Sequence, residues 1–593
     1  MTLDRNYPRP LLRRASWTSL DGWWDFAIDE QGAWSLPADV EWGGRIRVPF
    51  APETPASGVE AKGLLTACWY RRTFDCARPT PGHSVVLHFG AVDYEARVWV
   101  NGAPAVSHEG GYTPFDVDIT PFLDESGTQE IIVHALDDPN DLAKPRGKQD
   151  WQSEPHLIWY PRTTGIWQTV WYEVVPRQRI RALQWVPDLA RWEVRFELLI
   201  IGDGDAGLRL HVKLEAGGRL VADDLFGVVQ GEVSRGISLA DPGIDDFRNE
   251  LLWHPERPTL IDAHLRLLDP AGEVIDEAWS YTALRSVQVE GHVILLNGRP
   301  IQMRMLLDQG LWPESGMTAP DDEAFERDIA LVKAMGFNGV RKHQKVEDPR
   351  FLAAADRMGL MVWEEMPSAY RFTRTSVGRV VQQWRDVISR DLSHPCIVAW
   401  VPFNESWGVP DLPGAAAQRD LIRTMYHLTR TLDPTRPVSG NDGWESTATD
   451  IIGIHDYDQN PQRLAKRYET HEVLPQLIER ERPAGRRLVL EGAASHPIVL
   501  TEFGGMVFEG GGGGSNTHGY WLAETPEEFA EQFRTLITLV RELPLLAGFC
   551  YTQFTDTYQE KNGLLYADRT PKIPIEDIAA ATRRAPRWLH EEV

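Results

Sequence analysis

The chain has 593 residues, of which 42% are apolar and 25% are charged, and its formal net charge is −25 at pH 7. This length is sufficient for two to four globular domains with large cores. The negative charge argues against nucleic acid or an anionic membrane as a partner, because either would need clustered Lys and Arg.

The N-terminal sequence MTLDRNYPRPLLRR contains no apolar stretch of the kind found in signal peptides. No uninterrupted apolar segment of about 18 residues occurs, so we expect a cytoplasmic protein that does not cross a membrane. The four cysteines are too few for a disulfide framework and lie in strand-like or apolar runs. No cluster with metal-ligand spacing is present, so we expect neither a metal nor another cofactor.

Residues 1–178 predict an antiparallel β-sandwich. Residues 84–102 alternate apolar and polar side chains and end in Asn101-Gly102, the strongest short signal for a hairpin. Residues 163–176 predict another strand of this domain.

Residues 179–285 repeat this pattern with shorter strands, for example at 190–200 and 262–269. The segment is long enough for one small sandwich of the immunoglobulin type.

The pattern changes in residues 286–593. Residues 321–337 carry apolar side chains at helical spacing, opened by Asp321 and Asp322 and closed by Gly336. Strand-like runs then alternate with helical segments, and eight such units are typical of a TIM barrel, whose active site lies at the carboxyl ends of the strands. The predicted strands cover residues 301–309, 337–343, 359–367, 396–406, 436–442, 451–457, 497–505 and 545–556.

Two glutamates follow apolar barrel strands. Glu405 comes after the fourth predicted strand and Glu502 after the seventh, so the barrel places them across its mouth from each other. Two facing carboxylates are the minimum for hydrolysing a glycosidic bond, because one protonates the leaving oxygen and the other attacks or stabilises the anomeric carbon. The alternative is that each glutamate is a structural residue of the rim, held in an ion pair.

Short motifs in the same order along nearly the whole chain resemble glycoside hydrolase family 2, which includes β-galactosidases, β-glucuronidases and β-mannosidases. The resemblance implies a jelly-roll sugar-binding domain, an immunoglobulin-like domain and a catalytic TIM barrel. The motifs are LDGWWDF, VPFAPE, WYRRTF, FGAVDYEARVWVNG, GIWQTVW, LNGRPIQMR, NES and TEFGG.

The resemblance also implies roles for individual residues. Glu405 would be the general acid and base, and Glu502 the nucleophile that forms a covalent glycosyl-enzyme and retains configuration. Asn404 would hydrogen-bond the 2-hydroxyl of the sugar. Arg341 would keep Glu502 ionised through a bidentate pair, and His343 would touch the sugar unless it is structural.

Other polar and aromatic side chains at strand ends are weaker candidates, because aromatic rings also fill cores. Glu364 and Glu365 resemble an acidic pair that would support Arg341. The candidates for substrate binding are His455, Tyr457, Trp444, Gln553, Tyr551 and Trp521.

Five consecutive glycines, residues 510–514, follow the nucleophile motif. Such a run has no side chains to fix its path, so it is either a slack surface loop or a mobile lid that brings Trp521 or Tyr520 over the pocket.

The sequence does not identify the sugar on which the enzyme acts. The family's β-glucuronidases read the uronate with an Asn-x-Lys motif, and no clean copy of it follows Glu502. We therefore expect a retaining exo-β-glycosidase whose partner is a carbohydrate, with β-galactosides and β-glucuronides as the leading substrates. A catalytically silent glycan-binding protein with the same fold and a transglycosylase remain alternatives, and a homo-oligomer remains open.

Overall fold

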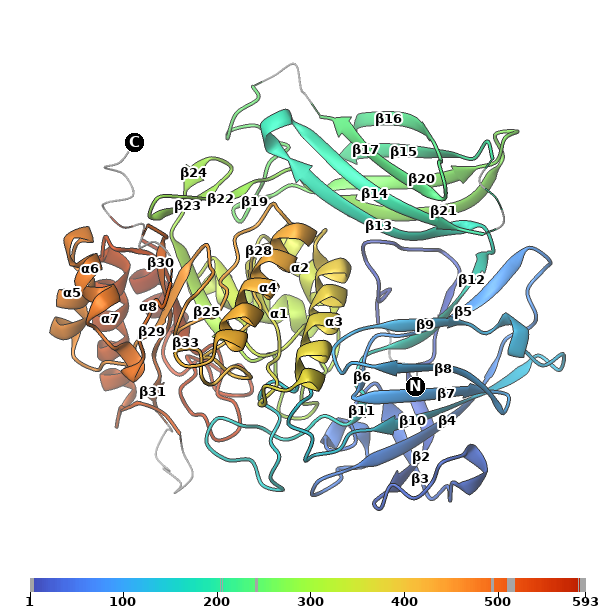
Figure 1. Ribbon diagram of the computed structural model, residues 1–593, viewed down its shortest axis with the longest axis horizontal. Helices are drawn as coiled ribbons and strands as arrows, with labels where there is room; N and C mark the ends of the chain where they lie inside the picture. Colours follow the sequence, from blue (N-terminus) through green and yellow to red (C-terminus); the bar gives the residue numbers. More distant parts are fainter. Residues whose placement is uncertain are drawn as a thin grey trace.

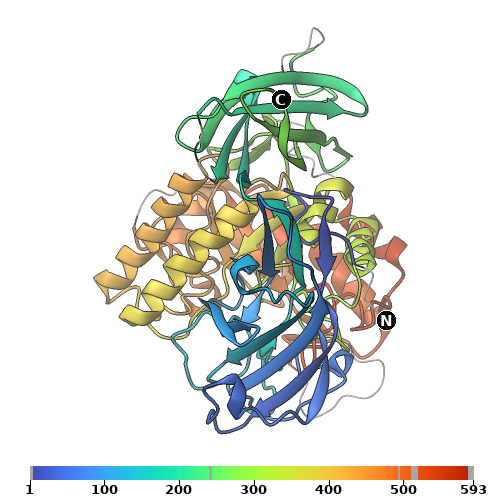
Figure 2. The same ribbon diagram turned by 90° about the vertical axis from the view of Figure 1, so that its right-hand side faces the viewer.

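The computed structural model describes residues 5–584 and 586, except 203, 205, 240–243, 492–494 and 509–517. Two β-sandwiches lie along one side of a β/α barrel (Figures 1 and 2). Within this part of the chain, no helix is both long and apolar enough to span a membrane. The glycine run 510–514 lies outside the described residues, so the lid stays a prediction.

The first sandwich consists of a six-stranded and a four-stranded antiparallel sheet, with a short pair of strands beside them. Asn101 and Gly102 join β7 to β8 with φ of 49° and 79°, which confirms the predicted hairpin. The predicted strand 163–176 is broken in two, β11 and β12. The strands are β1 Trp17–Ser19, β2 Gly22–Asp29, β3 Gly44–Val48, β4 Ala67–Asp75, β5 His83–Phe89, β6 Val92–Asp93, β7 Glu95–Val100, β8 Ala103–Glu109, β9 Phe115–Asp118, β10 Thr128–Leu136, β11 Gly165–Ile166 and β12 Val170–Pro176.

The second sandwich packs a three-stranded sheet on a four-stranded sheet. Alternate side chains of β14 are buried, as expected for a strand with one face on the core. Its strands are β13 Arg179–Asp188, β14 Glu193–Ile201, β15 Arg209–Ala216, β16 Arg219–Gly227, β17 Glu232–Ser238, β20 Ile261–Leu268 and β21 Val274–Thr282. Short strands lead from here to the barrel: β18 Trp253–His254, β19 Arg257–Pro258, β22 Val287–Glu290, β23 Val293–Leu296 and β24 Arg299–Pro300.

Seven parallel strands form the barrel sheet, in the order β28-β27-β26-β25-β33-β30-β29. The fifth predicted strand, 436–442, is reduced to two isolated bridges, Trp400 with Val438 and Asn404 with Asp442. Here side chains replace a neighbouring strand, since Asp450 accepts the backbone N–H of Val438. The barrel strands are β25 Met303–Asp308, β26 Gly339–Lys342, β27 Met361–Glu365, β28 Ile397–Val401, β29 Ile452–His455, β30 Ile498–Gly504 and β33 Leu546–Thr552.

Helices surround the barrel sheet (Figure 1). Within them apolar side chains face the strands, and one continuous buried cluster joins helices and strands. The four cysteines are free and buried, as predicted. The helices are α1 Glu323–Ala334, α2 Pro349–Met358, α3 Arg374–Asp391, α4 Ala416–Leu432, α5 Pro461–Tyr468, α6 Leu474–Glu479, α7 Pro526–Glu542 and α8 Ile575–Thr582, and a further short pair is β31 Met506–Val507 with β32 Trp521–Leu522.

A long loop, residues 137–164, leaves the first sandwich after β10 and runs along the barrel (Figure 1). The backbone N–H groups of Arg146 and Gly147 both donate to the carbonyl of Ser368 in the barrel, at 3.0 and 3.2 Å. Gly147 has φ of 60°, and a Cβ there would lie 2.3 Å from the carbonyl oxygen of Gln344, so only glycine allows this approach. The loop thereby places residues of the first sandwich at the mouth of the barrel.

Candidate active site

Glu405 sits on a tight turn directly beyond β28. Glu405 and Ser406 have φ of 50° and 57°, a left-handed conformation that side chains other than glycine rarely adopt. The turn is held by Trp407 N–H donating to the Asn404 carbonyl and by Glu405 N–H donating to the Asp442 carbonyl, both at 2.9 Å. Strained backbone of this kind persists where the surroundings fix it, and it is common at active sites.

The second glutamate, Glu502, ends up beside the first. An oxygen of Glu405, an oxygen of Glu502 and a ring nitrogen of His455 lie within 4.8 Å of one another. The prediction that the ends of the fourth and seventh strands bring the two carboxylates together is confirmed.

His455, the last residue of β29, connects the two carboxylates. Its Nδ1 lies 2.7 Å from Glu405 Oε1, and its Nε2 lies 3.4 Å from Glu502 Oε1. The same Nε2 is 3.1 Å from Asp442 Oδ2. The sequence suggested that His455 would contact the sugar, whereas the structure places its ring among three carboxylates.

Arg341 on β26 is the second cation of the site and is fully buried. Its Nη1 lies 3.0 Å from Glu502 Oε1 and 3.0 Å from Asp442 Oδ2. Its Nη2 donates to Asn404 Oδ1 at 2.6 Å. The prediction of a bidentate pair with Glu502 is wrong, because Nε and Nη2 instead share Glu365 Oε2 at 2.7 and 2.6 Å. A buried guanidinium needs all its donors satisfied, and one carboxylate cannot do this alone.

These contacts set the protonation of the site. Burial alone would raise the pKa of Glu502, but His455 and Arg341 hold that pKa below its ordinary value. Burial alone would lower the pKa of His455, but Glu502, Asp442 and Glu405 raise it to about 10. The site therefore holds an ionised Glu502 against a charged imidazolium at neutral pH.

The spacing of Glu405, His455 and Glu502 would also suit three ligands of a metal ion. A histidine binds a metal only when it is neutral, and the pKa of His455 is raised to about 10 by its carboxylate neighbours. Arg341 also lies against Glu502 on the same side. These three side chains are therefore better suited to sharing a proton than to binding a metal ion.

Tyr457 and Tyr520 lie stacked beside Glu502. The Tyr457 hydroxyl donates to Glu502 Oε2 at 2.7 Å, and the Tyr520 ring stacks on Tyr457 with centroids 3.7 Å apart. Trp521 belongs to β32 and packs against the barrel core instead. Of the two rings that the sequence offered for this segment, Tyr520 is the one that lies beside Glu502 through Tyr457, and the substrate contact proposed for Trp521 stays a prediction.

Two other candidates point away from the mouth. Glu364 precedes Glu365 on β27, and neighbouring side chains of a strand face opposite ways. Glu364 is buried beside Asp391 of α3, and burial with that carboxylate raises its pKa well above the ordinary value. Tyr551 packs its ring against Phe533 of α7, with centroids 5.3 Å apart. The predicted roles of Glu364 and Tyr551 at the site are wrong for the same reason. Side chains alternate between the two faces of a strand, and these two face the surrounding helices.

His343 and Gln553 lie deeper beside the site. His343 Nδ1 is 3.1 Å from Glu365 Oε1, and burial together with Lys148 lowers its pKa well below the ordinary value. Gln553 is buried, accepts from Gln309 at 2.9 Å and donates to Asn562 at 2.7 Å. Gln553 is engaged within the protein, whereas His343 Nδ1 is buried without a hydrogen-bond partner in the described part of the chain, so its contact with the sugar stays a prediction. Neither residue touches Glu405 or Glu502 by a hydrogen bond that the described residues show.

Trp444 borders the turn that carries Glu405. It is half-buried, and the guanidinium of Arg486 lies 4.4 Å from its ring centroid. Its neighbour Glu445 accepts a hydrogen bond of 2.9 Å from the Ser406 hydroxyl.

Several residues of the site were not foreseen from the sequence. Asp442 ends the fifth predicted strand, so its position at a strand end was a usable signal. Tyr160 and Lys148 come from the 137–164 loop and both contact Glu560, the Tyr160 hydroxyl by donation and Lys148 Nζ at 3.4 Å. No local pattern marks a loop residue that meets another domain.

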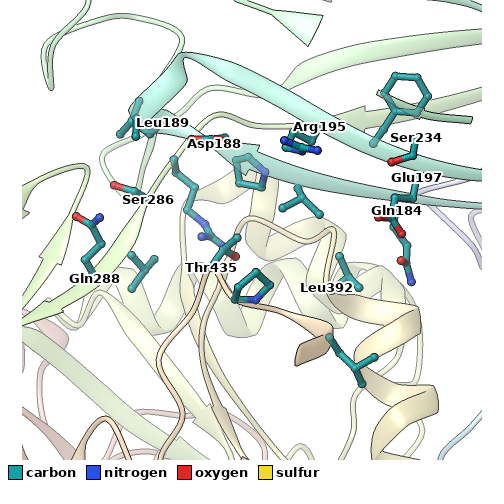
Figure 3. Close-up of a pocket in the computed structure, with 18 of the residues that line it drawn as sticks. Gln184, Asp188, Leu189, Arg195, Glu197, Ser234, Ser286, Gln288, Leu392 and Thr435 are labelled. Carbon is teal, nitrogen blue, oxygen red and sulfur yellow. The ribbon is translucent and has the colours of Figure 1, made fainter. Parts of the chain in front are cut away.

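A cavity of about 590 Å³ lies apart from the two glutamates, between β13–β14 and the barrel (Figure 3). Its two carboxylates, Asp188 and Glu197, are drawn toward opposite ends of this groove. Asp188 accepts from the backbone N–H of Arg191, and Glu197 is exposed on β14. The groove lacks the paired, buried carboxylates of the barrel mouth.

Replacing His455 tests the charge of the imidazolium. Its native pKa of about 10 exceeds the ordinary value of about 6.5, so its contribution to stability is complete below pH ~6.5 and is lost as the pH rises toward 10. Thermal unfolding of the wild type and His455→Gln at pH ~6, ~8 and ~10 should therefore show a difference in Tm that shrinks with pH. The control is His427→Gln, an exposed site on α4, and a His455 difference that stays constant would contradict the assignment.

Two family models match the chain, in the order that the fold shows. The sugar binding domain of glycosyl hydrolases family 2 matches residues 11–142, and the TIM barrel domain of the same family matches residues 287–581.

Curated relatives carry two activities. A β-galactosidase of Thermoanaerobacter pseudethanolicus is 27% identical over 406 residues, covering 67% of this chain and 51% of the relative. A β-glucuronidase of Paenibacillus borealis is 24% identical over 450 residues, covering 69% and 72%. The chain thus spans about half the length of the first of these relatives.

Solved structures match over nearly the whole chain. A β-glucuronidase of Bifidobacterium dentium has a TM-score of 0.76 and 20% identity over 96% of this chain and 97% of that one. A β-galacturonidase of Eisenbergiella tayi has a TM-score of 0.73 and 22% identity over 98% and 99%. These likenesses extend the shared fold across both sandwiches and the barrel. With both domain models matched in order along one polypeptide, the chain belongs to glycosyl hydrolases family 2.

Proposed function

We propose that the protein is a retaining exo-β-glycosidase that removes a terminal β-linked sugar by double displacement. The observation that carries this proposal is the spacing of the two carboxylates, whose nearest oxygens lie within 4.8 Å. Retaining enzymes hold their carboxyl groups about 5–5.5 Å apart, whereas inverting enzymes need more room for a water molecule.

In the first step a carboxylate oxygen of Glu502 bonds to the anomeric carbon while the bond to the leaving oxygen breaks. Glu405 gives its proton to that oxygen, and the aglycone leaves as an alcohol. In the second step Glu405 takes a proton from water, the water oxygen bonds to the anomeric carbon, and Glu502 is released. The ionised state of Glu502, held by Arg341 and His455, supports its role as nucleophile.

The remaining polar groups of the site position the carboxylates of Glu405 and Glu502. Tyr457 donates to the Glu502 oxygen that Arg341 does not contact. Asn404 accepts from Arg341 through Oδ1, which orients its amide so that the NH2 group serves as donor to a sugar hydroxyl. His455 donates to Glu405 and fixes the acid on its strained turn.

The charges of the site support a neutral sugar over a uronic acid. Arg341 and His455 already contact carboxylates, and Lys148 contacts Glu560. A uronate would bring another negative charge into a group of buried acids, and such a charge is costly without a cation of its own. We therefore place β-galactosides ahead of β-glucuronides.

A panel of aryl glycosides with one common phenol tests the function. It comprises the β-galactoside, β-glucuronide, β-mannoside, β-glucoside and α-L-arabinopyranoside, with the anomer released followed by NMR. We expect the highest kcat/KM on the β-galactoside and the β-anomer as first product. Inversion would contradict the mechanism, a preference for the glucuronide would contradict only the sugar, and no turnover on any member would support a silent glycan-binding protein.

Truncating each carboxylate separates the two roles. Glu502→Ala removes the nucleophile and should lower kcat by about 10³-fold or more for every leaving group. Glu405→Ala removes the acid and the base, so an acidic phenol should still leave while deglycosylation slows. Added azide needs no base and should accelerate Glu405→Ala, giving a β-glycosyl azide, whereas Glu502→Ala should give the α-azide if it gives any.

The control for both truncations is Glu154→Ala, an exposed glutamate of the 137–164 loop, which should behave as wild type. An α-azide from Glu405→Ala, or identical behaviour of the two variants, would overturn the assignment of roles.

Chelation tests the absence of a metal from the mechanism. Because His455 is protonated at neutral pH and Arg341 already lies against Glu502, activity should survive dialysis against EDTA unchanged. A loss of activity that Mg²⁺ or Mn²⁺ restores would show that a metal takes part.

A further inference from the structure

We propose that the enzyme prefers glycosides of planar aromatic alcohols, and that an aromatic wall beside Glu405 binds the aglycone. This inference rests on the proposed function of Glu405 as the acid. The aromatic wall is the set Trp151, His156, Trp159, Tyr370 and Trp407.

The chemistry fixes where the aglycone lies. The acid must reach the glycosidic oxygen, so the leaving group occupies the Glu405 side of the pocket. Trp407 belongs to the same turn as Glu405, which Trp407 closes by donating its backbone N–H to the Asn404 carbonyl. A leaving group that departs past Glu405 therefore meets the surface that begins at Trp407.

The rings of the wall are contiguous and come from two domains. Trp407 lies 6.3 Å from Trp159, nearly parallel at 24°, and 5.5 Å from Tyr370, centroid to centroid. Trp151 is 4.8 Å from Trp159 and 5.5 Å from Tyr370. His156 completes the set at 4.9 Å from Trp159. Trp407 and Tyr370 belong to the barrel, whereas the other three belong to the 137–164 loop.

Three of the five rings have polar atoms that are bound within the protein. The indole N–H of Trp159 donates to the Tyr370 hydroxyl at 2.8 Å, and that hydroxyl donates to the Gly147 carbonyl. His156 Nδ1 lies 2.7 Å from Asp150. These three rings are thus fixed from behind.

All five residues are only partly buried. Exposed aromatic surface at a pocket mouth is a usual sign of ligand contact. The contact between the two domains does not require this exposed surface, because Arg146 and Gly147 donate to Ser368, and Gln559 donates to the carbonyls of Leu157 and Trp159.

The bound polar atoms also decide the chemical class of the aglycone. A second sugar would need several hydrogen-bond partners for its hydroxyls, whereas Trp159, Tyr370 and His156 Nδ1 bind within the protein and the two other tryptophans of the wall offer one indole N–H each. A planar aromatic group needs only ring faces and edges, and these are what the wall offers.

Two glycosides of the same sugar test the wall. One carries 1-naphthol and the other hexafluoroisopropanol, alcohols of similar acidity, so that both make the same demand on Glu405. Trp159→Ala should lower kcat/KM about tenfold for the naphthyl glycoside, as expected for the loss of a ring contact, and leave the fluoroalkyl glycoside nearly unchanged. Trp159→Phe should recover most of the loss.

The matched control is Trp23→Ala, which removes an exposed tryptophan of β2 on the first sandwich and should change neither substrate. An equal loss on both substrates would mean that Trp159 only supports the fold, and no loss on either would mean that it is not part of the site. A comparable loss on a disaccharide of the same sugar would assign the wall to a sugar and overturn the aromatic assignment.

Direct binding separates this inference from the proposed function. Titration of free 1-naphthol against the Glu502→Ala protein, followed by quenching of tryptophan fluorescence, should give saturable binding that Trp159→Ala weakens about tenfold. If the wild type hydrolyses no glycoside but naphthol binding depends on Trp159, the proposed function fails while the wall stands. If glycosides are hydrolysed but naphthol binding does not depend on Trp159, only the wall is wrong.

Discussion

One buried guanidinium organises the barrel mouth. Arg341 has no solvent exposure and contacts Glu365, Asp442 and Glu502, which come from three different barrel segments. Each of these acids is a buried charge that the cation stabilises, and removing one partner of a buried ion pair costs about 3–5 kcal/mol. The strand ends are therefore held together by charge as much as by the apolar core.

The second cation follows from the first. Three carboxylates around one guanidinium leave excess negative charge, and His455 supplies the balance by holding its proton to about pH 10. Its two ring nitrogens reach Glu405 on one side and Asp442 with Glu502 on the other. The acid and the nucleophile are thus parts of a single ionic cluster, and the geometry of either depends on the other.

Apolar runs that end in polar residues made the barrel and its two glutamates predictable, because core burial and strand-end chemistry are both local properties of the sequence. The reduction of the fifth predicted strand to isolated bridges was not predictable, since it depends on the Asp450 side chain taking the place of a neighbouring strand as partner of Val438. The direction of a side chain at a strand end was equally hidden, so Glu364 and Tyr551 were assigned to the wrong face while Glu365 was placed correctly. Tyr160 and the ring of Trp159 could not be found, because their position depends on contacts between residues hundreds of positions apart, such as Tyr160 with Glu560.

The 137–164 loop has a consequence for how such an enzyme diversifies. The groups that break the bond belong to the barrel, whereas much of the surface beside them belongs to a loop of another domain that is held by backbone contacts such as those of Gly147 with Ser368. Substitutions at the exposed positions of the loop, unlike substitutions at Gly147, leave the ionic cluster around Arg341 undisturbed. Enzymes that descend from one ancestral barrel can therefore change their specificity for the leaving group while the catalysed reaction stays the same.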